Sequence, residues 1–101
     1  MITPSTPSPT IASKTHYLKT WPSYYDAVVA GVKRFEIRTN DRDFAVGDIL
    51  VLQCYDPKDG MRHSNGPGRW DEYHVRVTYI AQGIFGLPGN LCVMSIEPCA
   101  P

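Results

Sequence analysis

Apolar and polar residues alternate along much of the chain, which is the pattern of β-strands with one buried face. In one such segment Phe35 and Ile37 point to one side, and Arg34, Glu36 and Arg38 point to the other. This predicts a half-buried strand with a charged face. Another segment, ILVLQCY, is almost continuously apolar and fits a central strand. The predicted strands are residues 16–20, 33–38, 49–55, 73–80 and 91–96.

A segment between the first two strands has helical spacing instead. Its apolar residues from Tyr24 onward recur three or four positions apart. Ser23 is placed to cap the helix, with Asp26 in a weak capping box, and Gly31 is placed to end it. A helix of about two turns does not persist alone, so we expect it to pack on the sheet.

This order of elements predicts an α+β fold, because the later connections are too short for crossover helices. We expect a mostly antiparallel, curled sheet or a small five-stranded, mostly antiparallel β-barrel, with one short helix covering an open end. Residues 14–101 form one domain in this prediction. Residues 1–13 carry no charge and are rich in Pro, Ser and Thr, so a disordered leader is expected there. From the size of the chain we expect one domain and not a two-domain enzyme.

Ten basic and ten acidic residues give a formal charge of zero, which argues against a broad basic surface for nucleic acid. No apolar run approaches the ~20 residues of a membrane span, and no secretory signal is visible, so we expect a cytoplasmic protein. Cys54 and Cys92 lie in apolar runs and are expected to be reduced and structural. The histidine and cysteine spacings predict no metal site, and no cofactor is expected.

Nine of the eleven residues from 33 to 43 are polar or charged. One interpretation is a solvated strand face followed by a salt-bridged turn. The other is a site, because Glu36 and Arg38 share a face and the long Lys33 side chain can reach around the strand end. A carboxylate flanked by cations stays ionised and can act as a general base or bind a base edge, while a guanidinium suits phosphate.

The loop from residue 56 to 70 is 15 residues long, which suggests a functional or mobile segment. Arg69 and Trp70 together can form a stacking surface for a base. Trp70 packed back onto the barrel rim is the equal alternative. Tyr55, at the end of the central strand, is expected to face the same cleft.

The motif AxxxGxKxxExR, from Ala27 to Arg38, is followed by NDRxFxVGD from Asn40 to Asp48 and by strands reading VTYI and VMSI. With these motifs the chain resembles the ASCH domain, a branch of the PUA-like superfamily, and in particular its small bacterial and phage versions. The resemblance covers residues 16–96 and implies a five-stranded barrel with a cleft along the Gly31 to Arg38 segment.

ASCH and PUA-like domains are mostly associated with RNA or modified bases, so the resemblance implies such a ligand here. Some small members are amidohydrolases that deacetylate acetylated cytidine with a lysine, a threonine and a glutamate. Lys33 matches the lysine, whereas Glu36 occupies the threonine position. The glutamate of those enzymes lies in an insertion that this chain lacks.

Three functions follow from these observations. The first is a monomeric module that binds RNA or a single nucleotide in the cleft. The second is a small hydrolase acting on a modified nucleoside or on RNA, with Lys33 and Glu36 as the catalytic pair. The third is a phage or mobile-element product that binds a host protein. The candidate nucleic-acid-binding residues are Lys33, Glu36, Arg38, Asn40, Arg42, Tyr55, Arg69 and Trp70.

Overall fold

The computed structural model describes residues 13–63 and 70–100, and confirms a mostly-strand α+β domain with one short helix. Most of the expected leader, residues 1–12, lies outside the described residues. Within the described part, no helix has the length and apolarity needed to cross a membrane. The elements are β1 (Thr15–Thr20), α1 (Pro22–Val29), β2 (Phe35–Thr39), β3 (Ile49–Asp56), β4 (Gly60–Met61), β5 (Glu72–Gln82) and β6 (Leu91–Pro98).

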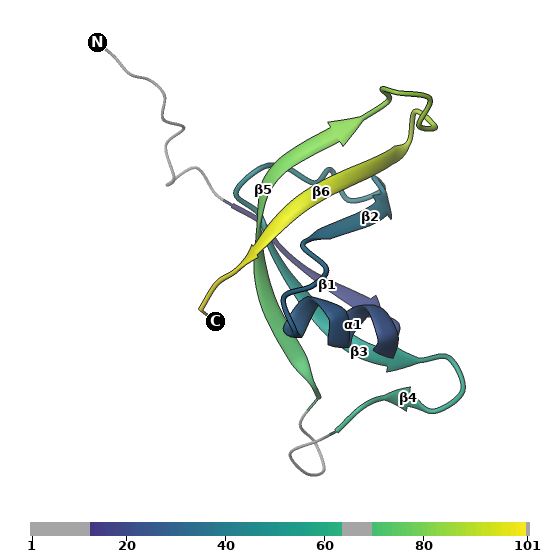
Figure 1. Cartoon of the computed structure of the whole chain (residues 1–101), viewed down its shortest axis with the longest axis vertical. Helices are drawn as coiled ribbons and strands as arrows, with labels where there is room; N and C mark the ends of the chain where they lie inside the picture. The colour runs from purple at the N-terminus through teal and green to yellow at the C-terminus, as the bar shows by residue number, and fades with distance from the viewer. Residues whose placement is uncertain (1–12, 64–69, 101) are drawn as a thin grey trace.

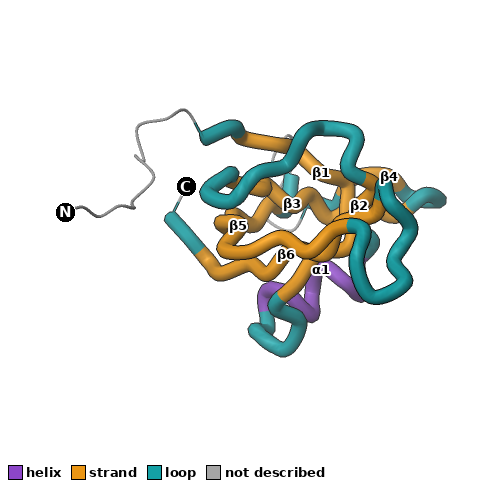
Figure 2. The backbone as a smooth tube through the Cα atoms, turned by 90° about the horizontal axis from the view of Figure 1, so that it is seen from above, coloured by secondary structure: helices purple, strands orange, loops and turns teal. Residues whose placement is uncertain are grey.

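The strands form one sheet in the order β1-β3-β5-β6-β2, and the short β4 pairs with β3 (Figure 1). Only β1 and β3 are parallel, and the other described pairs are antiparallel, as expected. The predicted closed barrel is wrong, because the described backbone pairing leaves β1 and β2 at the two ends of the sheet. The sheet is nevertheless curled, and from above these two edge strands lie on the same side (Figure 2).

Two arginine side chains bridge β2 and the loop after it to β1. Arg38 Nη2 donates to the Lys19 carbonyl at 3.1 Å, and Arg42 Nη1 donates to the Tyr17 carbonyl at 3.1 Å. Alternate residues of a strand present their carbonyls to the same edge, so both arginines meet the free edge of β1. These two side chains therefore span the gap between the edge strands β1 and β2. We call this bridged gap the seam.

The core lies between α1 and the curled sheet. The predicted central strand β3 is confirmed, since Leu50, Val51 and Leu52 are fully buried. Tyr25 and Val28 are the buried side chains of α1, so this short helix is held by its packing.

The helix begins earlier than the sequence predicts. Trp21 is the N-cap and Pro22 occupies the first turn, with no side-chain capping bond, so the expected Ser23 cap is wrong. Proline suits the first helical position because its fixed φ is already helical, and the start moves accordingly. The end is confirmed at Gly31, whose φ of 82° is the left-handed conformation that glycine adopts without strain.

The predicted alternation in β2 is confirmed. The charged face of the strand, however, points into the molecule and not toward solvent. Glu36 is 3% exposed, whereas Phe35 is 43% and Ile37 50% exposed. The charged face turns inward because Lys33 and Arg38 neutralise the carboxylate there.

The alternation in β5 holds only as far as Val77. Val75 and Val77 are buried, but Tyr79, which regular alternation would place on the same face, is exposed. A register shift against β6 between Val77 and Tyr79 moves the following side chains to the other face.

Candidate functional site

A pocket of about 790 Å³ lies where the end of β1, the start of α1 and β2 meet. Trp21, Tyr24 and Phe35 give it aromatic walls, and four charged side chains lie among the other residues that line it. We call this space the main pocket. Its charged residues are Lys19, Lys33, Glu36 and Arg38.

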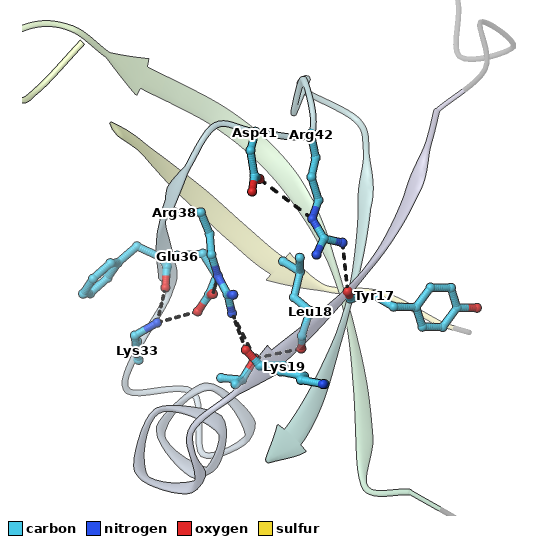
Figure 3. A network of polar contacts seen from close by, with 10 residues as sticks. Tyr17, Leu18, Lys19, Lys33, Glu36, Arg38, Asp41 and Arg42 are labelled. Atoms are coloured by element: carbon cyan, nitrogen blue, oxygen red, sulfur yellow. Dashed lines mark hydrogen bonds and ion pairs between the residues drawn. The ribbon is translucent and has the colours of Figure 1, made fainter. Parts of the chain in front are cut away.

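Glu36 is the centre of the charged cluster (Figure 3). Lys33 Nζ donates to Glu36 Oε1 at 2.7 Å, and Arg38 Nε donates to Oε2 at 2.9 Å. Alternation along β2 puts Glu36 and Arg38 on one face, and Lys33 reaches them from the turn before the strand. Charge-assisted hydrogen bonds of this kind are short and strong, and they compensate the burial of the carboxylate.

Arg38 and Lys33 each make further contacts. Arg38 Nη2 lies 3.2 Å from Thr20 Oγ1, which itself donates to the Leu18 carbonyl. Lys33 Nζ donates to the Phe35 carbonyl at 2.6 Å and lies 4.8 Å from the centre of the Phe35 ring. The cluster is therefore fixed to β1 on one side and to β2 on the other.

Trp21 and Tyr24 form an aromatic platform that the sequence analysis missed. Their rings are stacked with an interplanar angle of 7° and a centroid distance of 6.1 Å, and both are more than half exposed. The sequence signal is the Trp-Pro pair at the helix start, which leaves Trp21 outside the helix beside the first-turn Tyr24. Lys19, on the same rim, was also missed.

A second pocket of about 380 Å³ adjoins the first along the seam. Ile37 and Arg38 line both pockets, while Asp41 and Arg42 line only the second. Arg42 Nε lies 3.9 Å from Asp41 Oδ1, and its side chain is 47% exposed. We call this space the side pocket.

Several predicted site residues lie elsewhere. Asn40 organises the loop after β2, because its side chain donates to Gln82 Oε1 and accepts from the Phe44 amide. Tyr55 contacts Lys19, whose Nζ lies 4.8 Å from the ring centre, but does not line the main pocket.

The long loop does not reach the main pocket with its described residues. Trp70 packs its ring against His63, with centroids 4.3 Å apart, and is absent from the pocket walls. Arg69 lies outside the described residues. Arg62 donates to Asp71 at 2.6 Å and to Asp26 at 2.9 Å, so it fastens the loop to α1.

These ion pairs also affect the ionisation of their surroundings. The hydrogen bonds to Asp26 and Asp71 raise the pKa of Arg62. Burial, together with the nearby Asp71 charge, raises the pKa of Tyr25 to about 12. Tyr25 is therefore a neutral phenol at any ordinary pH.

A second buried carboxylate, Asp48, lies away from both pockets. His16 Nε2 is 2.8 Å from Asp48 Oδ2, and the amides of Lys14 and Ala45 donate to the same carboxylate. The Phe44 ring packs edge-on against His16 at 4.7 Å. Among residues 13–63 and 70–100 there is no group of three His, Cys, Asp or Glu side chains that could hold a metal ion.

The fold and the pocket define a small α+β domain with a charged, aromatic-walled site at the seam of its sheet. The chain belongs to the family described as Domain of unknown function (DUF3850), which matches residues 15–96. A 40-residue stretch is 42% identical to the uncharacterized 12.9 kDa protein in the GpA 3' region of Escherichia phage P2. That stretch is 40% of this chain and 37% of the phage protein, so most of the relative's length is not matched.

Proposed function

We propose that the protein binds single-stranded nucleic acid, RNA or a modified nucleotide, with one nucleotide held in the main pocket. The observation that supports this most directly is the stacked platform of Trp21 and Tyr24 beside the cluster around Glu36. The volume of the main pocket falls in the range of ~300–1,000 Å³ that is usual for small-molecule sites. Aromatic stacking combined with cations is the ordinary way in which proteins hold single strands.

The pocket residues have separate roles in this proposal. Lys19, Lys33 and Arg38 attract phosphate, and with Glu36 they give the pocket lining a net charge of +2. Each carboxylate oxygen has two lone pairs. Glu36 can therefore hold its two cations and still accept a hydrogen bond from the amino group of a base.

In this proposal the base stacks on other residues than the sequence indicated. The sequence favoured Trp70 or Tyr55, whereas the pocket walls are formed by Trp21, Tyr24 and Phe35. The two tryptophans are similarly half-exposed, which makes them a matched pair for an experiment.

The test is titration of wild type, Trp21→Ala and Trp70→Ala with short single-stranded RNA and with nucleoside monophosphates, followed by amide chemical shifts. We expect Trp21→Ala to weaken binding about fivefold or more, since a base stack contributes about 1–3 kcal/mol. Trp70→Ala should bind as wild type does. Equal weakening in both variants, or no binding by wild type, would contradict the proposal.

We also propose that the ASCH resemblance reflects a common PUA-like ancestry. Its motif residues support this, because Gly31 ends α1 while Lys33, Glu36 and Arg38 line the main pocket. The bridged seam is then the counterpart of barrel closure. An experimental structure that superposes on ASCH domains with these residues in register would support the relationship, and a different strand order would contradict it.

A second candidate function is hydrolysis of a modified nucleoside or RNA by Lys33 and Glu36. Their contact at 2.7 Å inside the main pocket favours it. Both side chains are already engaged, however, and the Thr20 hydroxyl donates to a backbone carbonyl, so no nucleophile stands free among them. Incubation with acylated nucleosides and RNA tests this function; turnover that persists in Lys33→Ala would contradict it.

A third candidate, binding of a host protein, is favoured by Phe85, which is 95% exposed in the connection between β5 and β6. Loss of a host-protein complex in Phe85→Ser, with nucleotide binding intact, would support it. A complex unaffected by Phe85→Ser would show that this side chain is not the anchor. The monomeric state and cytoplasmic location stay predictions.

A further inference from the structure

The two pockets are consecutive positions along the seam. The main pocket lies against Lys19 and Thr20 of β1, and the side pocket lies against Leu18. Ile37 and Arg38 line both, so these two residues of β2 lie at the boundary between them. Figure 3 shows Arg38 and Arg42 reaching toward β1 in the same direction, one after the other.

The spacing of the two arginines is set by the strand that they bridge. They bind the carbonyls of Lys19 and Tyr17, which are two residues apart. Two residues of a strand advance about 6.6 Å. That distance is close to the separation of successive phosphates in an extended single strand.

The charge along the seam fits the same ligand. The walls of the two pockets contain the cations Lys19, Lys33, Arg38 and Arg42 and the carboxylates Glu36 and Asp41, a net charge of +2. The whole chain has a formal charge of zero. The excess is therefore local: it lies in the main pocket, while the side pocket, lined by Arg38, Asp41 and Arg42, has a net charge of +1.

We propose that the side pocket is a second nucleotide subsite, in which Arg42 binds the phosphate next to the nucleotide held in the main pocket. This inference rests on the proposed function and adds that the ligand is a strand of at least two nucleotides that crosses the seam. Arg42 uses Nη1 for Tyr17, and a guanidinium has five N–H donors, so it can bridge β1 and a phosphate together.

The experiment compares the four ribonucleoside 5′-monophosphates with the four 5′-phosphorylated homotrinucleotides, as RNA and as DNA, by amide chemical-shift titration. For Arg42→Gln we expect about tenfold weaker binding of trinucleotides, the effect of one lost hydrogen bond to a charged group. Monophosphate binding should stay unchanged. The slope of log affinity against log salt should become shallower by ~0.7 for the trinucleotide.

Arg76→Gln is the matched control, because Arg76 is also 47% exposed and ion-paired but lines neither pocket. Arg42→Lys, which keeps the charge, should recover part of the affinity. Thermal unfolding of each variant separates loss of the seam contact from loss of the subsite. A variant that unfolds at the wild-type temperature and still binds trinucleotides normally would overturn the inference.

Failure of the inference differs from failure of the proposed function. If wild type binds monophosphates and trinucleotides equally tightly, the second subsite is wrong while the main pocket stands. If wild type binds neither, both are wrong. Weaker binding of both ligand lengths in Arg42→Gln would place Arg42 in the main site and would also overturn the second subsite.

Discussion

Glu36 and Asp48 are both almost fully buried carboxylates, at 3% and 2% exposure, but their surroundings differ. Asp48 takes its hydrogen bonds from a buried histidine and two backbone amides. Glu36 takes its hydrogen bonds from Lys33 and Arg38, two long side chains that reach the surface beside a pocket.

The two carboxylates differ in whether their hydrogen-bond donors can also bind a ligand. The donors of Asp48 are fixed in the backbone and core, so this carboxylate holds the turn before β3 against β1. The donors of Glu36 have further N–H groups that can be shared with a ligand. Burial of a carboxylate therefore does not by itself indicate a candidate site; partly exposed partners with N–H groups to spare are the better sign.

Substitution of Asp48 is expected to have the largest effect on the free energy of unfolding. Asp48→Asn replaces an acceptor for three donors with an amide and leaves at least one buried donor without its charged partner. We expect a loss of about 3 kcal/mol in the free energy of unfolding, measured with urea. Nucleotide binding by the folded fraction should be unchanged. A loss below 1 kcal/mol in the free energy of unfolding would show that Asp48 does not hold the turn before β3 against β1 as we describe.

Glu36→Gln is the matched amide variant at the pocket. Lys33 and Arg38 can turn to water when the carboxylate is lost, so we expect a smaller loss of about 2 kcal/mol. Nucleotide binding should fall at the same time, because the cations lose their fixed positions. If Glu36→Gln cost as much stability as Asp48→Asn and left binding intact, the two carboxylates would have the same structural role.

Tyr25 is a buried acid whose neutral form is favoured. Its pKa rises from 10.0 to about 12 on folding, so its stabilising effect is complete below pH 10 and is lost as the pH approaches 12. We expect unfolding free energy to be roughly 1.4 kcal/mol lower at pH 11 than at pH 9 from this group alone. Tyr25→Phe should remove that part of the pH dependence, and an unchanged slope in the variant would contradict the assignment.

The smallest effect concerns the thiols. Burial raises the pKa of Cys54 and of Cys92, so both should react slowly with a thiol reagent, while the partly exposed Cys99 reacts first. Cys92 pairs with Arg38 across β2 and β6. In Glu36→Gln we therefore expect the Cys92 rate, followed by mass spectrometry, to rise more than the Cys54 rate. Equal acceleration would show that β2 does not loosen by itself.

Periodicity predicted the strands and the helix well, because burial on one face requires it. It also placed Glu36 and Arg38 together, since residues two apart on a strand share a face. It did not show which face of β2 turns inward. That choice depends on Lys33 and Arg38 meeting the carboxylate, a tertiary arrangement that outweighs the burial of Phe35 and Ile37.

The other errors have related causes. The aromatic platform was missed because it forms only where the end of β1 and the start of α1 meet β2. For Trp70 the sequence left a stacking surface and a ring packed back onto the domain as equal alternatives, and in the structure its ring packs on His63. The register shift after Val77 and the unclosed barrel depend on strand pairing, which a single sequence does not specify.

The seam also bears on self-association. The exposed edge of a sheet invites pairing with another chain, and natural proteins guard such edges with charged side chains. Here Arg38 of β2 binds the Lys19 carbonyl on the edge of β1, and Arg42 of the loop after β2 binds the Tyr17 carbonyl. The edge of β1 is thus covered from the opposite end of the same sheet, and the two arginines that cover it also line the main pocket and the side pocket.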